Sequence, residues 1–208
     1  LTLDGQGVSG TKGINVTSAG RLQILDCVLR NFDATAIQLR PTTALQYVIS
    51  NIVIQDSDSG LSVSPASQSP GASGAVNRLV VSGASWGVSV SATSLTGNAQ
   101  NYMTITDSVL SGNATGLIVA SIANSARATA VVQHSTIANN TSSGIYHFVN
   151  GVGQTIPTSI RIGDTTIANN PKGIRFEHSA TVSSLGNNMF TDNGVDLDGG
   201  TLVALTPK

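Results

Sequence analysis

The hydrophobic and polar positions of this chain follow a repeated pattern, which is clearest between residues 107 and 173. The segment Asp107-Ser-Val-Leu-Ser-Gly-Asn returns as His134-Ser-Thr-Ile-Ala-Asn-Asn and again as Asp164-Thr-Thr-Ile-Ala-Asn-Asn. After a short turn, each copy continues with a glycine and a triplet of residues. The first and third residues of the triplet are expected to point inward and the second outward. The repeat therefore predicts one structural unit that is used several times along the chain.

The glycine before each hydrophobic triplet marks the phase of the repeat. The markers are Gly13, Ala36 in place of a glycine, Gly60, Gly87, Gly116, Gly144 and Gly173. Neighbouring markers are about 23 to 29 residues apart, and a period in this range is typical of solenoid proteins. Because the spacing varies while the triplet persists, we expect insertions in loops between fixed strands.

Within the triplets, inward and outward positions alternate as in a β-strand with one buried face. The first inward column is Ile14, Ile37, Leu61, Val88, Leu117, Ile145, Ile174 and Val195, and the second is Val16, Leu39, Val63, Val90, Val119, His147, Phe176 and Leu197. The residues between and after them should point outward. In the last coils these outward residues include Tyr146, Phe148, Arg175, Glu177, Asp196 and Asp198.

Two further hydrophobic stretches in each repeat predict two more short strands, so that each coil has three. One coil cannot bury its own apolar side, so the coils must stack, with equivalent strands in register and parallel. We predict an all-β, single-stranded parallel β-helix of about seven or eight coils, which forms a single domain over residues 1–208. Residues 65–74 are expected to form a loop that leaves the coil, and residues 199–208 a terminal strand or tail.

Asparagine and aspartate recur at two bends of each coil, as expected for residues that tolerate left-handed backbone. The first column is Asp26, Asn51, Asn77, Asp107, His134, Asp164 and Asn187, and the second is Asn31, Asp56, Ser82, Gly112, Asn139, Asn169 and Asp192. Asparagine amides stacked at one bend can bond to the copies above and below. We interpret these columns as architecture, because a catalytic or metal site would interrupt the repeat.

The composition limits the classes of partner. Only 10% of the 208 residues are charged and the net charge is −1, which provides no basic patch for nucleic acid. No apolar run approaches the roughly 20 residues that a membrane-spanning helix needs, so we expect no membrane insertion. Cys27 is the only cysteine, which rules out an internal disulfide. The low charge and the many serine, threonine and asparagine residues suit a secreted, periplasmic or cell-surface protein.

The motifs Asp107-Ser-Val-Leu-Ser-Gly-Asn…Gly-Leu-Ile-Val and Asp164-Thr-Thr-Ile-Ala-Asn-Asn…Gly-Ile-Arg-Phe resemble right-handed parallel β-helix proteins of the pectin-lyase-like superfamily. The resemblance covers residues 13 to 198 and implies a right-handed coil. It implies no single activity, because the superfamily includes polysaccharide lyases, polygalacturonases, epimerases, tailspike enzymes and surface proteins. The polygalacturonase and epimerase motifs are missing here, and no catalytic residues can be assigned.

One outward cluster breaks the repeat near its end. If Arg175 and Asp196 share one column and Glu177 and Asp198 the next, three carboxylates would lie on adjacent rungs, followed by His178. Glu177, Asp196 and Asp198 are then candidate calcium ligands, although no cofactor is required. Arg175 could hold an acidic sugar, and Tyr146 and Phe148 could stack on sugar rings. The alternative interpretation is a group of exposed ion pairs that protects the last rung.

Other single residues have structural and functional interpretations. His147 falls in an inward column and is expected to be a packed, hydrogen-bonded core histidine. Trp86, the only tryptophan, either covers a coil edge or provides a platform for a sugar.

The leading hypothesis is an exported β-helix protein that contacts polysaccharide. The alternatives are a carbohydrate-active enzyme, either a lyase or a glycoside hydrolase, and a structural segment of a longer surface protein. Flanking segments or another subunit are expected to cap the exposed ends of the β-helix.

Overall fold

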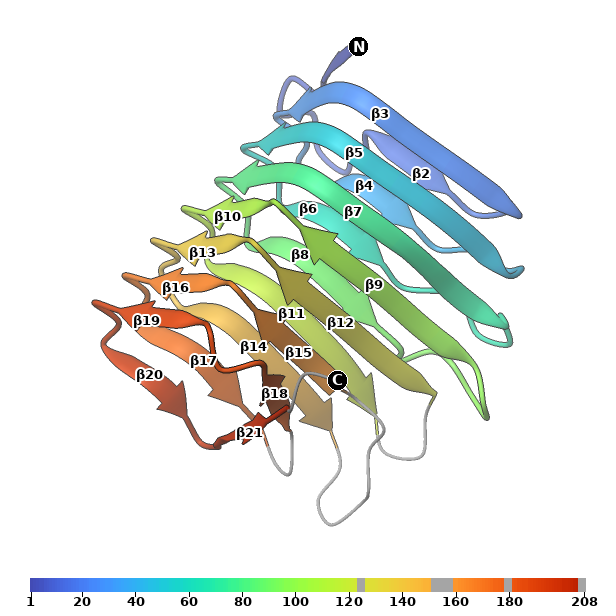
Figure 1. The fold of residues 1–208 in the computed structure, drawn as a ribbon. Coiled ribbons are helices and arrows are strands. Elements are labelled where there is room, and N and C mark those ends of the chain that lie inside the picture. Colours follow the sequence, from blue (N-terminus) through green and yellow to red (C-terminus); the bar gives the residue numbers. More distant parts are fainter. Residues whose placement is uncertain (123–125, 151–158, 178–180, 206–208) are drawn as a thin grey trace.

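The computed structural model describes residues 1–122, 126–150, 159–177 and 181–205. These residues form strands, turns and bends with no helix, and the strands stack into a parallel β-solenoid of about seven turns. Figure 1 shows the coils one below another from the N-terminal β3 to the C-terminal β20. The predicted all-β parallel solenoid is therefore confirmed. No described segment is a helix long and apolar enough to cross a membrane.

One wall of the solenoid is a sheet of eight parallel strands. In spatial order these are β2 (Ile14–Val16), β4 (Thr35–Leu39), β6 (Ser59–Val63), β8 (Trp86–Ser91), β11 (Thr115–Ile122), β14 (Ser143–Asn150), β17 (Lys172–Phe176) and β20 (Val195–Asp198). Its register places Leu117 beside Ile145 and Ile145 beside Ile174. The predicted first inward column is thus confirmed from Ile14 to Ile174.

The other strands form a sheet of thirteen strands that bends around the core. They are β1 (Thr2–Asp4), β3 (Arg21–Arg30), β5 (Leu45–Gln55), β7 (Gly71–Ser82), β9 (Gln100–Thr106), β10 (Val109–Ser111), β12 (Arg127–Gln133), β13 (Thr136–Ala138), β15 (Ser159–Gly163), β16 (Thr166–Ala168), β18 (Val182–Ser184), β19 (Met189–Thr191) and β21 (Leu202–Ala204). The long strands β3, β5 and β7 continue through the bend. In the next coil two separate strands replace the long one, so β7 pairs with β9 before the bend and with β10 after it.

The interior is filled by stacked aliphatic side chains. Ile105, Leu117, Val132, Ile145 and Ile174 are all fully buried. Burying each such side chain contributes about 1.5–3 kcal/mol, so the columns rather than any single contact hold the coils together.

The first bend of each coil lies at a residue in the left-handed region. Asp26, Asp107 and Asp164 have φ angles of 54°, 51° and 46°, as predicted for this column. The prediction of Asn77 is wrong, because Arg78 holds this position with a φ angle of 51°. Asn77 lies in β7 opposite Thr106, and its Nδ2 donates to Asp107 Oδ2 at 2.8 Å.

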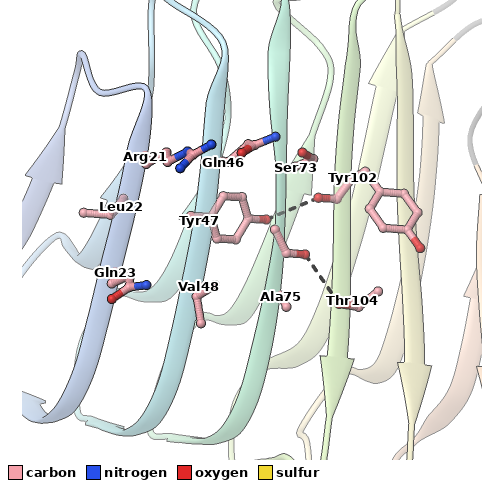
Figure 2. Close-up of a pocket in the computed structure, with 11 residues that line it drawn as sticks. Arg21, Leu22, Gln23, Gln46, Tyr47, Val48, Ser73, Ala75, Tyr102 and Thr104 are labelled. Carbon is pink, nitrogen blue, oxygen red and sulfur yellow. Dashed lines mark hydrogen bonds between the residues drawn. The ribbon is translucent and has the colours of Figure 1, made fainter.

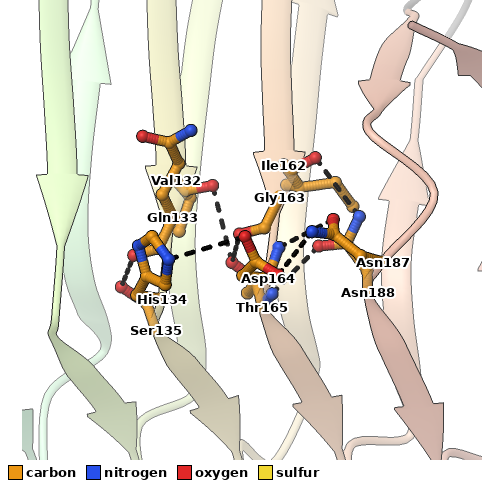
Figure 3. A network of polar contacts seen from close by, with 10 residues as sticks. All are labelled: Val132, Gln133, His134, Ser135, Ile162, Gly163, Asp164, Thr165, Asn187 and Asn188. Carbon is orange, nitrogen blue, oxygen red and sulfur yellow. Dashed lines mark hydrogen bonds and ion pairs between the residues drawn. The ribbon is translucent and has the colours of Figure 1, made fainter. Parts of the chain in front are cut away.

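Polar side chains connect the first bends of neighbouring coils, as Figure 3 shows for three of them. His134 Nε2 lies 3.5 Å from Asp164 Oδ2, and Asp164 N–H donates to Asn187 Oδ1 at 3.0 Å. Asn187 Nδ2 in turn donates to Asp164 Oδ1. Because His134 and Asp164 are exposed, this pair contributes at most about 1 kcal/mol.

The second bend contains a buried asparagine ladder, one residue after the predicted column. Asn113, Asn140 and Asn170 are at most 2% exposed, and their backbone N–H groups donate to the side-chain oxygen of the next asparagine, which for Asn170 is Asn193. Gly83, with a φ angle of 70°, holds the left-handed position that was assigned to Ser82. The ladder satisfies backbone groups that the turn would otherwise leave buried without partners.

The predicted loop over residues 65–74 is shorter than expected. Strand β7 begins at Gly71, and Ala72 pairs with Leu45 of β5 and with Asn101 of β9. Small residues at 71–75 hid this strand, because they lack the aliphatic alternation on which the prediction depended. At the C-terminus, β21 pairs with β18, so part of segment 199–208 is a strand.

The register of the last coil differs from the prediction by two residues. Leu197, not Val195, is the neighbour of Ile174, and Val195 lies beside Lys172 with 41% of its surface exposed. The asparagine ladder sets this register, since Asn170 and Asn193 stand at equal distances in sequence from Ile174 and Leu197. The prediction that Val195 continues the first inward column and Leu197 the second is therefore wrong.

Candidate functional site

The predicted group of carboxylates does not form. Because of the two-residue shift, Arg175 lies beside Asp198 and not beside Asp196. Glu177, Asp196 and Asp198 are not part of any group of three or more potential metal ligands within the described ranges. The described residues thus give no support to the calcium site predicted from these three carboxylates, and His178 lies outside the described residues.

The charged residues of this region form separate ion pairs instead. Arg175 Nη2 lies 3.0 Å from Glu177 Oε1, and Lys172 Nζ lies 2.7 Å from Asp198 Oδ2. Asp196 accepts a hydrogen bond from Asn193 Nδ2 at 2.9 Å. Each of these three carboxylates thus has its own partner among the described residues.

The aromatic part of the predicted cluster does come together. The rings of Tyr146 and Phe148 meet edge to face, with centroids 5.8 Å apart and planes at 64°. The guanidinium carbon of Arg175 lies 4.5 Å from the centroid of the Tyr146 ring, in a cation–π arrangement. Arg175 sits on the rung after Tyr146, so it supports this ring from the C-terminal side.

These two rings form one wall of a groove of about 390 Å³ on the outer face of the eight-stranded sheet. Trp86, at the start of β8, also borders it and is 48% exposed. The lining residues are Ser62, Ser64, Trp86, Ser89, Ser91, Thr93, Ile118, Ala120, Tyr146 and Phe148.

The groove follows from the order of side-chain sizes along two outward columns. One column reads Ser62, Ser89, Ile118 and Tyr146 on consecutive strands, and its neighbour includes Ser91, Ala120 and Phe148. Small side chains on β6 and β8 form the floor, and the large rings on β14 end it. Strands in a sheet are about 4.8 Å apart, so the step from β6 to β14 spans about 14 Å.

The groove combines hydroxyl groups with aromatic surfaces and carries no charged side chain. Ser91 Oγ and Thr93 Oγ1 lie 2.9 Å apart, which places two hydroxyls side by side at its edge. Burial, reinforced by the nearby Glu177 carboxylate, raises the pKa of Tyr146 to about 12. The Tyr146 phenol is therefore neutral at ordinary pH. Its hydroxyl donates to the Glu177 carboxylate, and its oxygen can still accept a hydrogen bond.

Sequence reasoning recognised only part of this groove. Tyr146 and Phe148 were predicted as ligand-binding residues. Trp86 was predicted either to cover the edge of a coil or to provide a platform for a sugar. Ser62, Ser89 and Ala120 were placed on the outer face but were given no role. The available signal was the column itself, in which small outward residues precede large aromatic ones.

A second hollow of about 440 Å³ lies over β3, β5, β7 and β9 (Figure 2). Its exposed lining includes Gln46, Ser73 and Tyr102. Tyr47 extends from β5 toward β9, where its hydroxyl donates to the Tyr102 carbonyl at 3.4 Å, and Gly74 leaves room for its ring. Tyr102 is the one exposed aromatic side chain lining this hollow, so it lacks the facing aromatic surfaces of the first groove.

His147 lies directly beneath the first groove, in the inward column beside Val119 and Phe176. Its side chain is fully buried, as predicted, but neither ring nitrogen has a hydrogen-bond partner among the described residues. Burial lowers the pKa of His147 to about 4. The predicted hydrogen bond is thus missing, and the imidazole is neutral at ordinary pH.

Comparisons with known proteins do not assign a family. No protein-family model, no curated protein and no solved structure matches this chain at a significant level.

Proposed function

We propose that this protein binds polysaccharide in the groove bordered by Trp86, Tyr146 and Phe148. The observation that carries the proposal is the pairing of exposed aromatic surfaces with a floor of serine hydroxyls. Sugar rings present apolar C–H faces and polar hydroxyl edges, so a site that offers both kinds of surface matches them. Aromatic side chains provide this kind of amphipathic contact, and ligand sites commonly combine apolar walls with a few polar groups.

The groove crosses several rungs, which favours a chain-like ligand that runs along the solenoid axis. A glycan placed there would contact the hydroxyl-lined floor on β6 and β8 and meet the rings of β14. We further propose that the protein is an exported member of the pectin-lyase-like superfamily. The repeated motifs and the parallel solenoid support this assignment, although the shared fold by itself does not imply a shared activity.

Replacing an aromatic wall residue should weaken glycan binding without unfolding the protein. We expect Trp86→Ala and Phe148→Ala each to lower affinity about tenfold, which corresponds to roughly 1.4 kcal/mol. Trp86→Phe should retain most of the binding, because it keeps an aromatic surface. The measurement is a screen on an oligosaccharide array, followed by calorimetric titration of the ligand that binds best.

Tyr102→Ala provides a matched control, because it removes an exposed aromatic ring from the second hollow. It should leave binding unchanged, and a loss of binding in this variant would move the site to that hollow. Absence of binding across the array would contradict the proposal and favour a structural surface segment. Release of reducing ends or of unsaturated uronates would instead establish the enzymatic alternative.

A further inference from the structure

Arg40 lies at the end of the groove that is opposite to the aromatic rings of β14. It directly follows β4, and its backbone N–H donates to the Val16 carbonyl at 2.8 Å, so the strand pairing extends to this residue. Leu39 pairs with Val63. The next residues along these two strands, Arg40 and the groove-lining Ser64, are therefore neighbours. Because Leu39 is fully buried, alternation along the strand turns Arg40 to the outer face, where it is exposed.

The guanidinium group of Arg40 is available to a ligand. Arg40 takes part in no ion pair among the described residues. Arg175, by contrast, lies against the Tyr146 ring and is held by Glu177 at 3.0 Å. An unpaired guanidinium offers several N–H donors in one plane, an arrangement that suits the oxygens of a carboxylate. One end of the groove is therefore aromatic and the other is cationic, with uncharged lining residues between them.

We propose that Arg40 binds an anionic group of the glycan, so that the ligand is a largely neutral chain with an isolated carboxylate. This inference rests on the proposed function and names its ligand class. The neutral part of the chain occupies the serine floor and the aromatic wall, which offer hydroxyl groups and apolar surface. From β4 to β14 there are four steps of about 4.8 Å, which place the carboxylate about 19 Å from the rings of Tyr146 and Phe148. The charge thus fixes the direction in which the chain lies.

The charge of the ligand can be varied while its backbone stays the same. Cello-, xylo-, manno- and galacto-hexasaccharides are each compared with two singly charged forms. One form is oxidised to a carboxylate at the reducing end, and the other carries a uronate at the non-reducing end. For the backbone that binds, we expect one of the two charged forms to bind about fivefold more tightly than the neutral form at low ionic strength, the effect of one exposed ion pair. This difference should decrease as salt is added, because exposed charge pairs are screened.

Arg40→Gln tests the assigned role of Arg40. It should remove the preference for the charged form and leave the affinity for the neutral form unchanged, whereas Arg40→Lys should keep part of the preference. Arg21→Gln is the matched control, because Arg21 is also exposed and has no ion pair among the described residues. Arg21 lies on β3 beside the second hollow, so its replacement removes the same charge from another face and should keep the preference. Thermal melting of the variants checks that each remains folded.

The outcomes separate this inference from the proposed function. Binding of a neutral hexasaccharide with no increase for either charged form would overturn the role of Arg40 while leaving the groove as a glycan site. Equal increases for both charged forms would contradict a fixed direction. A preference that survives Arg40→Gln would place the anion contact elsewhere, and a preference lost in Arg21→Gln would place it at the second hollow. If no oligosaccharide bound, charged or neutral, both proposals would fail.

Discussion

Asn140→Ala is expected to destabilise the protein by about 4 kcal/mol, the largest effect that we predict for a single side chain. Asn140 Oδ1 accepts from the Asn113 N–H at 3.1 Å, and its Nδ2 donates to the Leu110 carbonyl at 3.2 Å. Alanine removes both partners, and the site is too deeply buried for water to replace them. Each buried polar group left unpaired costs about 1–3 kcal/mol. Since small domains are stable by only about 5–15 kcal/mol, this loss would be severe.

The neighbouring Asn139 provides the control. It is exposed, has a φ angle of 57°, and its side chain bonds to the half-buried Ser111 and the exposed Asn169. Asn139→Gly keeps the left-handed backbone and should cost no more than about 1 kcal/mol. Unfolding in guanidinium chloride, monitored with two spectroscopic probes, would compare the free energies of unfolding of the two variants. Equal losses for Asn139→Gly and Asn140→Ala would show that the buried ladder contributes little.

The fold could be predicted because its repeat carries the same information many times. Any one triplet is ambiguous, but Leu117, Ile145 and Ile174 in equivalent phase allow only one face of a stacked sheet. Errors occurred where the local sequence admits two phases, as at Asn77 and Arg78 or at Val195 and Leu197. A slip of one residue exchanges the buried and exposed faces, and a slip of two residues keeps the faces but changes every neighbour. The second kind of error placed Asp196 beside Arg175, where the structure has Asp198.

The candidate site was harder to predict. It depends on which residues of adjacent coils become neighbours and on side-chain contacts within a single coil. Tyr146 and Phe148 were found from their outward phase alone. Whether Arg175 is free or paired depends on the side-chain conformations of Glu177 and Tyr146, which alternation along a strand does not determine. The groove itself is formed by the absence of large side chains at Ser89 and Ala120. Sequence patterns emphasise large hydrophobic residues, so a hollow formed by small ones leaves little signal.

His147 should make the protein less stable as the pH falls from about 6.5 toward 4. Burial lowers its pKa from 6.5 to about 4 in the folded state, so the unfolded chain binds the proton more readily in this window. The free energy of unfolding therefore decreases with falling pH, by up to about 3 kcal/mol at the acid end. Above pH 6.5 this group should cause no pH dependence, since it is neutral in both states.

His147→Leu removes the titrating group and the two unpartnered nitrogens while keeping an apolar side chain of similar size. We expect the variant to be as stable as the wild type, or more stable, at pH 7, because replacing an unsatisfied polar group by an apolar one is close to neutral or favourable. The difference in stability between the two proteins should then grow as the pH falls to 4. Measuring this difference cancels the contribution of the carboxylates, which titrate in both. A difference that stays constant across this range would mean that His147 is protonated in the folded protein as readily as in the unfolded chain.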